Sequence, residues 1–129
     1  MLPAAGQGAL GIEVRTDRRD VIDALAPLVH HTTWLAIAAE RAVSRAMGGS
    51  CSMPLAAFAT LTQDRLMIEA AWGDTEQKLP LVRACQESVV TDLVSAAALG
   101  QQVADELRAA VLAQGGSLPH LVVAGEAGR

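Results

Sequence analysis

The chain has 129 residues, enough for one domain with a buried core, and it carries 10 Lys and Arg against 14 Asp and Glu. The resulting net charge of −4 gives no indication of nucleic-acid or membrane-surface binding. No apolar stretch approaches the roughly 20 residues that span a bilayer. The first residues show neither a basic region nor an apolar leader, so we expect a cytoplasmic protein.

The first part of the chain predicts a strand followed by a short helix. Apolar residues at every second position favour a strand over residues 9–15. Asp17 is expected to cap a helix, which Pro27 would kink or end because proline has no N–H and clashes with the preceding turn. His30 and His31 then fall in a loop. We interpret them as part of a cap region rather than as a catalytic base.

A second helix is predicted from Trp34 to Met47, and the run Gly48-Gly49-Ser50 is expected to terminate it. Glu40 and Arg41 are expected to form a structural ion pair. The predicted apolar stripe is made mostly of small side chains, namely Leu35, Ala38, Ala39, Ala42 and Ala46.

The middle of the chain predicts three antiparallel strands. Leu55–Thr62 and Arg65–Trp72 flank Gln63-Asp64, which is typical of a tight hairpin turn. A third strand is predicted over Lys78–Gln86. Pro80 within it places this strand at an edge of the sheet, since proline cannot donate to a neighbouring strand.

A long final helix is expected to open at Asp92 or Ser95 and to end at Gly115-Gly116. Residues 121–123 are predicted to form either a last short strand or a frayed tail. The buried stripe of the helix is predicted to contain Leu93, Ala97, Gly100, Ala104, Leu107 and Val111.

Together these elements predict an α+β fold. We expect a small three-stranded antiparallel sheet with helices packed on one face. The strand over residues 9–15 does not fit this unit, so we expect it to belong to the sheet of another domain.

Two cysteines, Cys51 and Cys85, are present, and neither lies in a zinc-binding spacing with the three histidines. Cys51 follows a helix within a loop rich in Gly, Ser and Pro, which favours an accessible sulfur. The end of a helix disfavours a thiolate, so this position suits an attachment thiol better than a catalytic nucleophile. Taken alone, each cysteine is also compatible with a small apolar core residue, and for Cys85 a partly buried strand position is expected.

Two separated motifs resemble porphobilinogen deaminase. The first is LPAAGQGALGIEVR over residues 2–15, and the second combines AERA over residues 39–42 with GGSCSMP over residues 48–54. The resemblance continues through the hairpin and the last helix, so it covers nearly the whole chain. Ser50 departs from the family pattern, in which many members have a second glycine before the cysteine.

The resemblance implies that Cys51 holds a dipyrromethane cofactor through a thioether. Gln7 and Arg15 match family positions that contact this cofactor, and Gly49 and Ser50 lie beside the attachment point. For Arg15, spacing alone would suggest only a surface charge at the end of a strand. No catalytic residue is expected in this chain, because the family's catalytic carboxylate lies in the first domain.

The family reaction is a transferase step of tetrapyrrole and haem biosynthesis, in which four porphobilinogen units are joined with loss of ammonia into hydroxymethylbilane. The resemblance assigns residues 1–16 to a strand and turn leading from a missing N-terminal domain, and residues 17–129 to the C-terminal cofactor-attachment domain. The partners it implies are porphobilinogen, the growing polypyrrole and the missing domains. The unpaired strand suggests in addition that the chain forms homo-oligomers.

The charge balance of the chain agrees with the resemblance in placing most of the substrate-binding cleft in the other domains. A growing polypyrrole carries many carboxylates and requires a basic cleft, which a chain of net charge −4 does not supply. We therefore expect this chain alone to be inactive and to lack dipyrromethane. Two other classes remain open: a non-catalytic α+β module that associates with or complements another chain, and a thiol redox or metal domain that uses Cys51 and Cys85.

Overall fold

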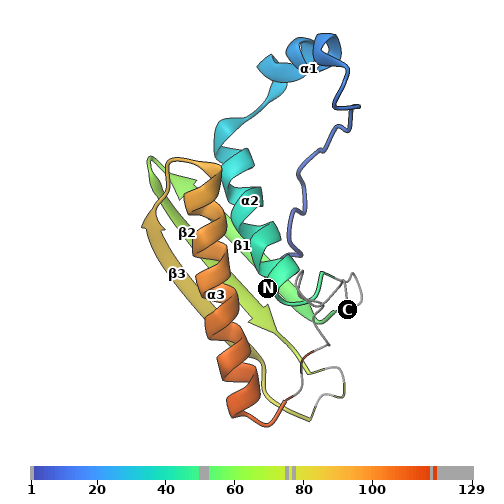
Figure 1. Ribbon diagram of the computed structural model, residues 1–129. Helices are drawn as coiled ribbons and strands as arrows, with labels where there is room; N and C mark the ends of the chain where they lie inside the picture. The colour runs from blue at the N-terminus through green and yellow to red at the C-terminus, as the bar shows by residue number, and fades with distance from the viewer. Residues whose placement is uncertain (1, 50–52, 75, 77, 117, 119–129) are drawn as a thin grey trace, which may run out of the picture.

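The computed structural model describes residues 2–49, 53–74, 76, 78–116 and 118. Ser50, Cys51 and the strand predicted over residues 121–123 lie outside the described residues. The elements in chain order are α1 (Arg19–Leu25), a 3-10 helix (Ala26–Leu28), α2 (His31–Ala46), β1 (Leu55–Thr62), β2 (Arg65–Trp72), β3 (Val82–Val89) and α3 (Leu93–Ala113) (Figure 1).

The three strands form one antiparallel sheet in the order β1-β2-β3. The hairpin between β1 and β2 has the predicted bounds, and Gln63 adopts the positive φ of 58° that such a short turn requires. The third strand was predicted too early in the chain. It begins at Val82, two residues after Pro80, and it is an edge strand as expected.

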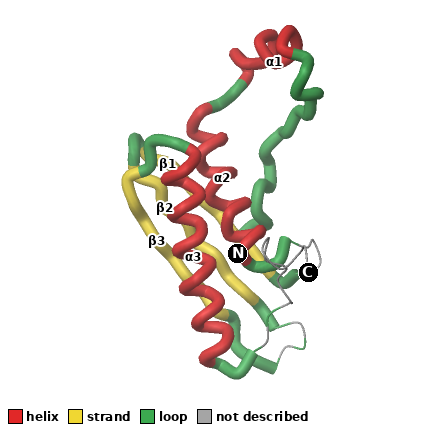
Figure 2. Tube along the Cα trace, in the orientation of Figure 1, coloured by secondary structure: helices red, strands yellow, loops and turns green. Residues whose placement is uncertain are grey.

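The structure has two layers, with α2 and α3 side by side on one face of the sheet (Figure 2). This arrangement confirms the predicted α+β fold and the packing of helices on one face. The largest fully buried side chains lie between the two layers and are Leu35, Met47, Leu66, Ile68, Leu107, Val43, Val90 and Val103.

Close approach of the two long helices depends on a missing side chain. A Cβ added at Gly100 of α3 would lie 2.3 Å from the Ala39 carbonyl oxygen and 2.8 Å from the Ala42 Cβ on α2. No real Cβ tolerates the first distance, so the two backbones can approach this closely only because residue 100 is glycine. The small apolar face predicted for residues 34–47 therefore serves helix–helix packing.

The beginning of α3 is fixed by a reciprocal cap. The Asp92 side chain accepts a hydrogen bond from the Ser95 backbone N–H at 2.8 Å, and the Ser95 hydroxyl oxygen accepts one from the Asp92 N–H at 3.3 Å. Of the two predicted openings, Asp92 is the N-cap. Leu93 had been predicted to lie on the buried stripe, but it is 43% exposed because it is the first residue of the helix.

The segment before α2 differs most from its prediction. No strand forms over residues 9–15, and Leu10 is 90% exposed, because no described strand of this chain pairs with the segment. Figure 1 shows this stretch running from the body of the molecule out to α1, and α1 makes element contacts only with the 3-10 helix that follows it. The side chain of Asp17 does not cap α1, whose N-cap residue is Arg18.

The 3-10 helix contains Pro27 near its start and ends the first helical segment as expected. His30 occupies the N-cap position of α2, but His31 is already the first helical residue rather than part of a loop. Taken singly, no described helix is long and apolar enough to cross a membrane. Arg19–Leu28 and His31–Ala46 meet those requirements only jointly, across a bend of 105°.

Candidate cofactor-attachment site

The first motif is tied to the body of the domain at the free edge of β1. The Ala57 N–H donates a hydrogen bond to the Pro3 carbonyl oxygen at 3.0 Å. The Gly6 N–H donates to Oε2 of Glu40 at 2.8 Å. Residues 3–6 therefore lie beside both β1 and α2, although about 35 to 55 residues of chain separate the partners.

Gln7 lies at a turn that its own side chain closes. Its backbone N–H donates to the Ala4 carbonyl oxygen at 3.2 Å. In return, its side-chain Oε1 accepts a hydrogen bond from the Ala4 N–H, also at 3.2 Å. The Ala9 N–H continues the turn by donating to the Gly6 carbonyl oxygen at 3.2 Å. Gln7 remains exposed, which is compatible with contact to a further molecule.

Glu40 does not form the ion pair expected with Arg41. It is only 4% exposed, and its two carboxylate oxygens accept backbone hydrogen bonds, from Gly6 at 2.8 Å and from Ala59 at 2.9 Å. Neighbouring residues on a helix do not face one another, and Arg41 is exposed while Glu40 points into the domain. Sequence reasoning did not identify this function for Glu40.

The second motif begins where α2 ends. The Gly49 N–H donates to the Ser44 carbonyl oxygen at 2.8 Å and the Gly48 N–H to the Arg45 carbonyl oxygen at 3.2 Å, the pattern of a Schellman cap. This confirms that the glycine pair terminates the helix. Gly49 has a φ of +70°, and a Cβ added there would meet nothing within 4 Å. The chain thus leaves the helix through an open, glycine-dependent bend, two residues before Cys51.

The two motifs meet again on the other side of the undescribed residues 50–52. Leu2 from the first motif and Met53 and Pro54 from the second line a groove of about 280 Å³. Its remaining walls come from β1, β2, the segment before β3 and β3 itself, which contributes Arg83 as the charged group. Both described flanks of Cys51 therefore border open space, which a bulky covalent group on that residue requires.

Arg15 lies on the exposed segment that leads to α1. Its guanidinium pairs with Asp17 at 2.7 Å, and both side chains are largely exposed. The structure does not bring Arg15 together with Gln7 through any hydrogen bond among the described residues. Its predicted contact with a cofactor stays a prediction.

Cys85 lies on β3 as expected, but it is exposed rather than partly buried. It stands opposite Glu69 on the face of the sheet that the helices leave open. The pKa of its thiol is raised, first by partial desolvation and then by the charges of Glu69, Glu106 and Glu87. Within the described part of the chain, no group of three or more His, Cys, Asp or Glu side chains is arranged to hold a metal ion.

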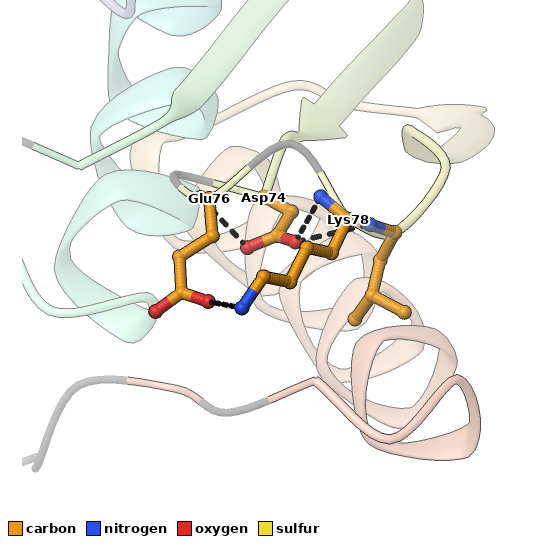
Figure 3. Close-up of polar contacts among 4 residues, drawn as sticks. Asp74, Glu76 and Lys78 are labelled. Atoms are coloured by element: carbon orange, nitrogen blue, oxygen red, sulfur yellow. Dashed lines mark hydrogen bonds and ion pairs between the residues drawn. The ribbon is translucent and has the colours of Figure 1, made fainter.

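The loop between Trp72 and β3 also borders the groove next to Met53 and Pro54. One carboxylate organises the backbone of this loop. Asp74 accepts backbone hydrogen bonds from Glu76 at 3.1 Å, Lys78 at 2.8 Å and Leu79 at 3.0 Å (Figure 3). These backbone donors hold the pKa of Asp74 below its ordinary value. The Lys78 Nζ in turn pairs with Glu76 Oε2 at 2.8 Å.

The fold and the site together define an α+β domain in which α2 ends at a glycine pair and an N-terminal turn is tethered to the same helix. Comparison with known families matches residues 34–109 to the model described as porphobilinogen deaminase, C-terminal domain. This chain belongs to the porphobilinogen deaminase family.

Individual relatives agree with the family model. The chain is 73% identical over 118 residues to the porphobilinogen deaminase of Albidiferax ferrireducens, covering 92% of this chain and 38% of that protein. It is 51% identical over 106 residues to the enzyme of the same name from Burkholderia thailandensis, covering 82% of this chain and 32% of the relative. The chain is 52% identical over 109 residues to the porphobilinogen deaminase of Ralstonia nicotianae, covering 82% of this chain and 32% of the relative. The chain thus spans about a third of the length of these relatives.

Proposed function

We propose that this chain supplies the cofactor-attachment domain of an enzyme that joins four porphobilinogen molecules, with one water, into hydroxymethylbilane and four ammonia molecules. This is a transferase step of tetrapyrrole and haem biosynthesis. The observation that carries the proposal is the 73% identity over 92% of the chain to a protein named porphobilinogen deaminase. The matched region is 118 residues long. It also leaves about 60% of the relative's length to be supplied by other domains.

Cys51 is the proposed attachment point for dipyrromethane. Its sulfur would hold the cofactor through a thioether bond to a pyrrole methylene, and the thiol proton would pass to the pyrrole nitrogen as that bond forms. When bound, dipyrromethane supplies the primer on which the pyrrole chain grows. The open bend at Gly49 and the groove beyond Met53 support this assignment, because they provide room on both described sides of the cysteine.

The other proposed contacts come from residues around the cysteine and from the first motif. Gly49 and Ser50 would bring backbone close to the first ring. Gln7 is exposed at the tethered turn, where its remaining hydrogen-bonding capacity is available to the cofactor. Arg15 is proposed to exchange its partner Asp17 for a pyrrole carboxylate, since an exposed ion pair of this kind contributes little stability.

The partners of this chain are proposed to be the preceding domains of the enzyme. We assign residues 1–16 to the connection with those domains and residues 17–129 to the attachment domain. Leu10, Ile12 and Val14 alternate along the exposed segment, which suits a strand that completes another domain's sheet. With a net charge of −4, this chain alone would not hold a polycarboxylate, so catalysis and cofactor assembly would require the other domains.

Reassembly tests the proposal. This chain is combined with a polypeptide that supplies the preceding part of the Albidiferax ferrireducens relative, and consumption of porphobilinogen is followed. The expected result is turnover by the mixture and none by either part. Cys51→Ala should abolish the turnover, whereas Cys85→Ala, at an exposed cysteine among carboxylates, should retain it. Turnover by the Cys51→Ala mixture, or by this chain alone, would contradict the proposal.

One observation favours a second function, association without catalysis. The segment from Leu10 to Val29 exposes several large apolar side chains, with Leu10 at 90% and Leu28 at 68%. Such a surface would support self-association of this chain when the other domains are absent. Light scattering decides this point: a mass that rises with concentration supports association, and a constant monomer mass at all concentrations argues against it.

A further inference from the structure

Glu40 is the only charged or polar side chain that is buried among the described residues. None of the ion pairs in this part of the chain includes it. A buried carboxylate without a cationic partner is costly unless N–H groups satisfy its oxygens. Here each oxygen has one backbone donor, Gly6 for Oε2 and Ala59 for Oε1.

The two donors belong to separate parts of the chain. Ala59 lies on the free edge of β1, since β1 pairs with β2 on its other side only. Ala57, two residues earlier on the same edge, donates to the Pro3 carbonyl oxygen at 3.0 Å. The N-terminal segment and the Glu40 side chain therefore satisfy neighbouring donors along one edge. Glu40 bridges this edge to Gly6, which begins the turn that carries Gln7.

The helix that carries Glu40 ends five residues before Cys51 in the sequence. α2 ends at Ala46, six residues after Glu40, or roughly 9 Å along the helix axis. The hydrogen bonds from Gly48 and Gly49 to the last turn then fix the backbone at the end of the helix. A rigid element thus connects the Glu40 carboxylate with the start of the attachment loop.

We propose that Glu40 is a positioning residue for the cofactor. It holds the Gly6-Gln7-Gly8 turn in a fixed place relative to α2 and so keeps Gln7 available to the cofactor proposed on Cys51. Glu40 touches neither the cofactor nor the substrate and acts through the Gly6 N–H. This inference rests on the proposed attachment at Cys51 and extends it to a residue outside the attachment loop.

An isosteric substitution of Glu40 distinguishes its hydrogen bond with Gly6 from its hydrogen bond with Ala59. Glu40→Gln has almost the same shape, but its amide offers one acceptor oxygen, and its NH₂ group would face the second N–H donor. The Ala59 N–H is fully buried and the Gly6 N–H only partly, so the remaining oxygen should stay with Ala59. Glu40→Ala removes both acceptors. Glu106→Gln, on the exposed face of α3, is the matched control for loss of a carboxylate.

Amide hydrogen exchange on the full 129-residue chain measures the bridge directly. In Glu40→Gln the Gly6 amide should exchange about tenfold faster than in the parent chain, and the Ile68 amide in the centre of the sheet should be unchanged. In Glu40→Ala both Gly6 and Ala59 should exchange faster, and Glu106→Gln should match the parent chain. Equal Gly6 exchange in all variants would overturn the proposal.

Cofactor loading in the reassembled enzyme measures the consequence. With porphobilinogen as the probe, the rate at which Cys51 gains a dipyrromethane mass should fall at least about fivefold in Glu40→Gln, and Glu106→Gln should load at the parent rate. Loading of Glu40→Gln at the parent rate would refute the positioning role alone. A parent chain that never loads would instead refute the proposed function, and with it any role of Glu40 toward a cofactor.

Discussion

Oε2 of Glu40 lies 2.8 Å from the backbone nitrogen of Gly6, so a side chain in the middle of α2 holds a turn that lies 34 residues earlier. The carboxylate's other oxygen holds the edge of β1 through Ala59. Hydrogen bonds to a buried charged acceptor are stronger than bonds between neutral groups, and the loss of such an acceptor leaves its donors unsatisfied. This contact joins the two sequence motifs within the folded domain.

Removal of the Glu40 carboxylate should lower the stability of the whole domain. Glu40→Ala leaves the N–H groups of Gly6 and Ala59 without acceptors and opens a small cavity, so the free energy of unfolding should fall by about 3 kcal/mol. Urea denaturation followed by circular dichroism gives this value. Glu106→Ala, which loses an exposed contact to Gln86, should change it by less than about 0.5 kcal/mol. Equal stabilities of the two variants would contradict the account of Glu40.

Gly100 should be nearly irreplaceable. An alanine Cβ would lie 2.3 Å from the Ala39 carbonyl oxygen, so α2 and α3 would have to separate. The free energy of unfolding should therefore fall by about 2 kcal/mol, even though alanine is the better helix former. Thermal unfolding of Gly100→Ala and of Gln102→Ala, an exposed position on the same helix, provides the comparison. A Gly100→Ala melting temperature at or above that of the parent chain would show that the helices are not so close.

The cap of α3 should make the stability of the domain depend on pH in the acidic range. The hydrogen bonds from the Ser95 hydroxyl and backbone N–H hold the pKa of Asp92 below its ordinary value. A depressed folded-state pKa means that this stabilisation is present above the ordinary aspartate pKa, about 4, and is lost as the pH falls through the folded-state pKa. Asp92→Ala should lower the melting temperature by a few degrees at pH 7, and the difference from the parent should shrink toward pH 2. Asp23→Ala, at an exposed residue of α1, should show neither effect.

Asp74 should organise the loop that leads into β3. Its carboxylate accepts three backbone N–H groups, whereas the Glu76–Lys78 ion pair beside it is exposed (Figure 3). Asp74→Ala should therefore accelerate amide exchange at Lys78 and Leu79 several-fold, and Glu76→Gln should leave both amides almost unchanged. The opposite ranking of the two variants would assign the order of this loop to the ion pair instead.

Local sequence rules predicted the parts of the fold in which short-range chemistry decides the outcome. The hairpin at Gln63-Asp64 was located correctly because strand alternation and turn residues occur next to each other. The start of β3 was misplaced because apolar residues around Pro80 resemble a strand, while pairing with β2 begins only at Val82. Residues 9–15 have strand alternation, but a strand needs a partner, and the described chain provides none.

The site was predictable in its motifs but not in its contacts. The bend at Gly49 follows from two glycines after a helix, and the structure confirms that they end it. The buried position of Glu40 was missed because its neighbour Arg41 suggested an ion pair. A better signal was available in the spacing: Glu40 lies three residues before Val43, on the side of the helix that the core covers. The donors in Gly6 and Ala59 are backbone groups, which no side-chain pattern reveals.

The most direct test of the central claim is the mass of the peptide that contains Cys51, taken from the enzyme reassembled with its preceding domains and incubated with porphobilinogen. An added dipyrromethane mass is expected on Cys51 and none on Cys85. No addition is expected when this chain is incubated alone. An unmodified Cys51 in an assembly that converts porphobilinogen, or the added mass on Cys85, would contradict the account.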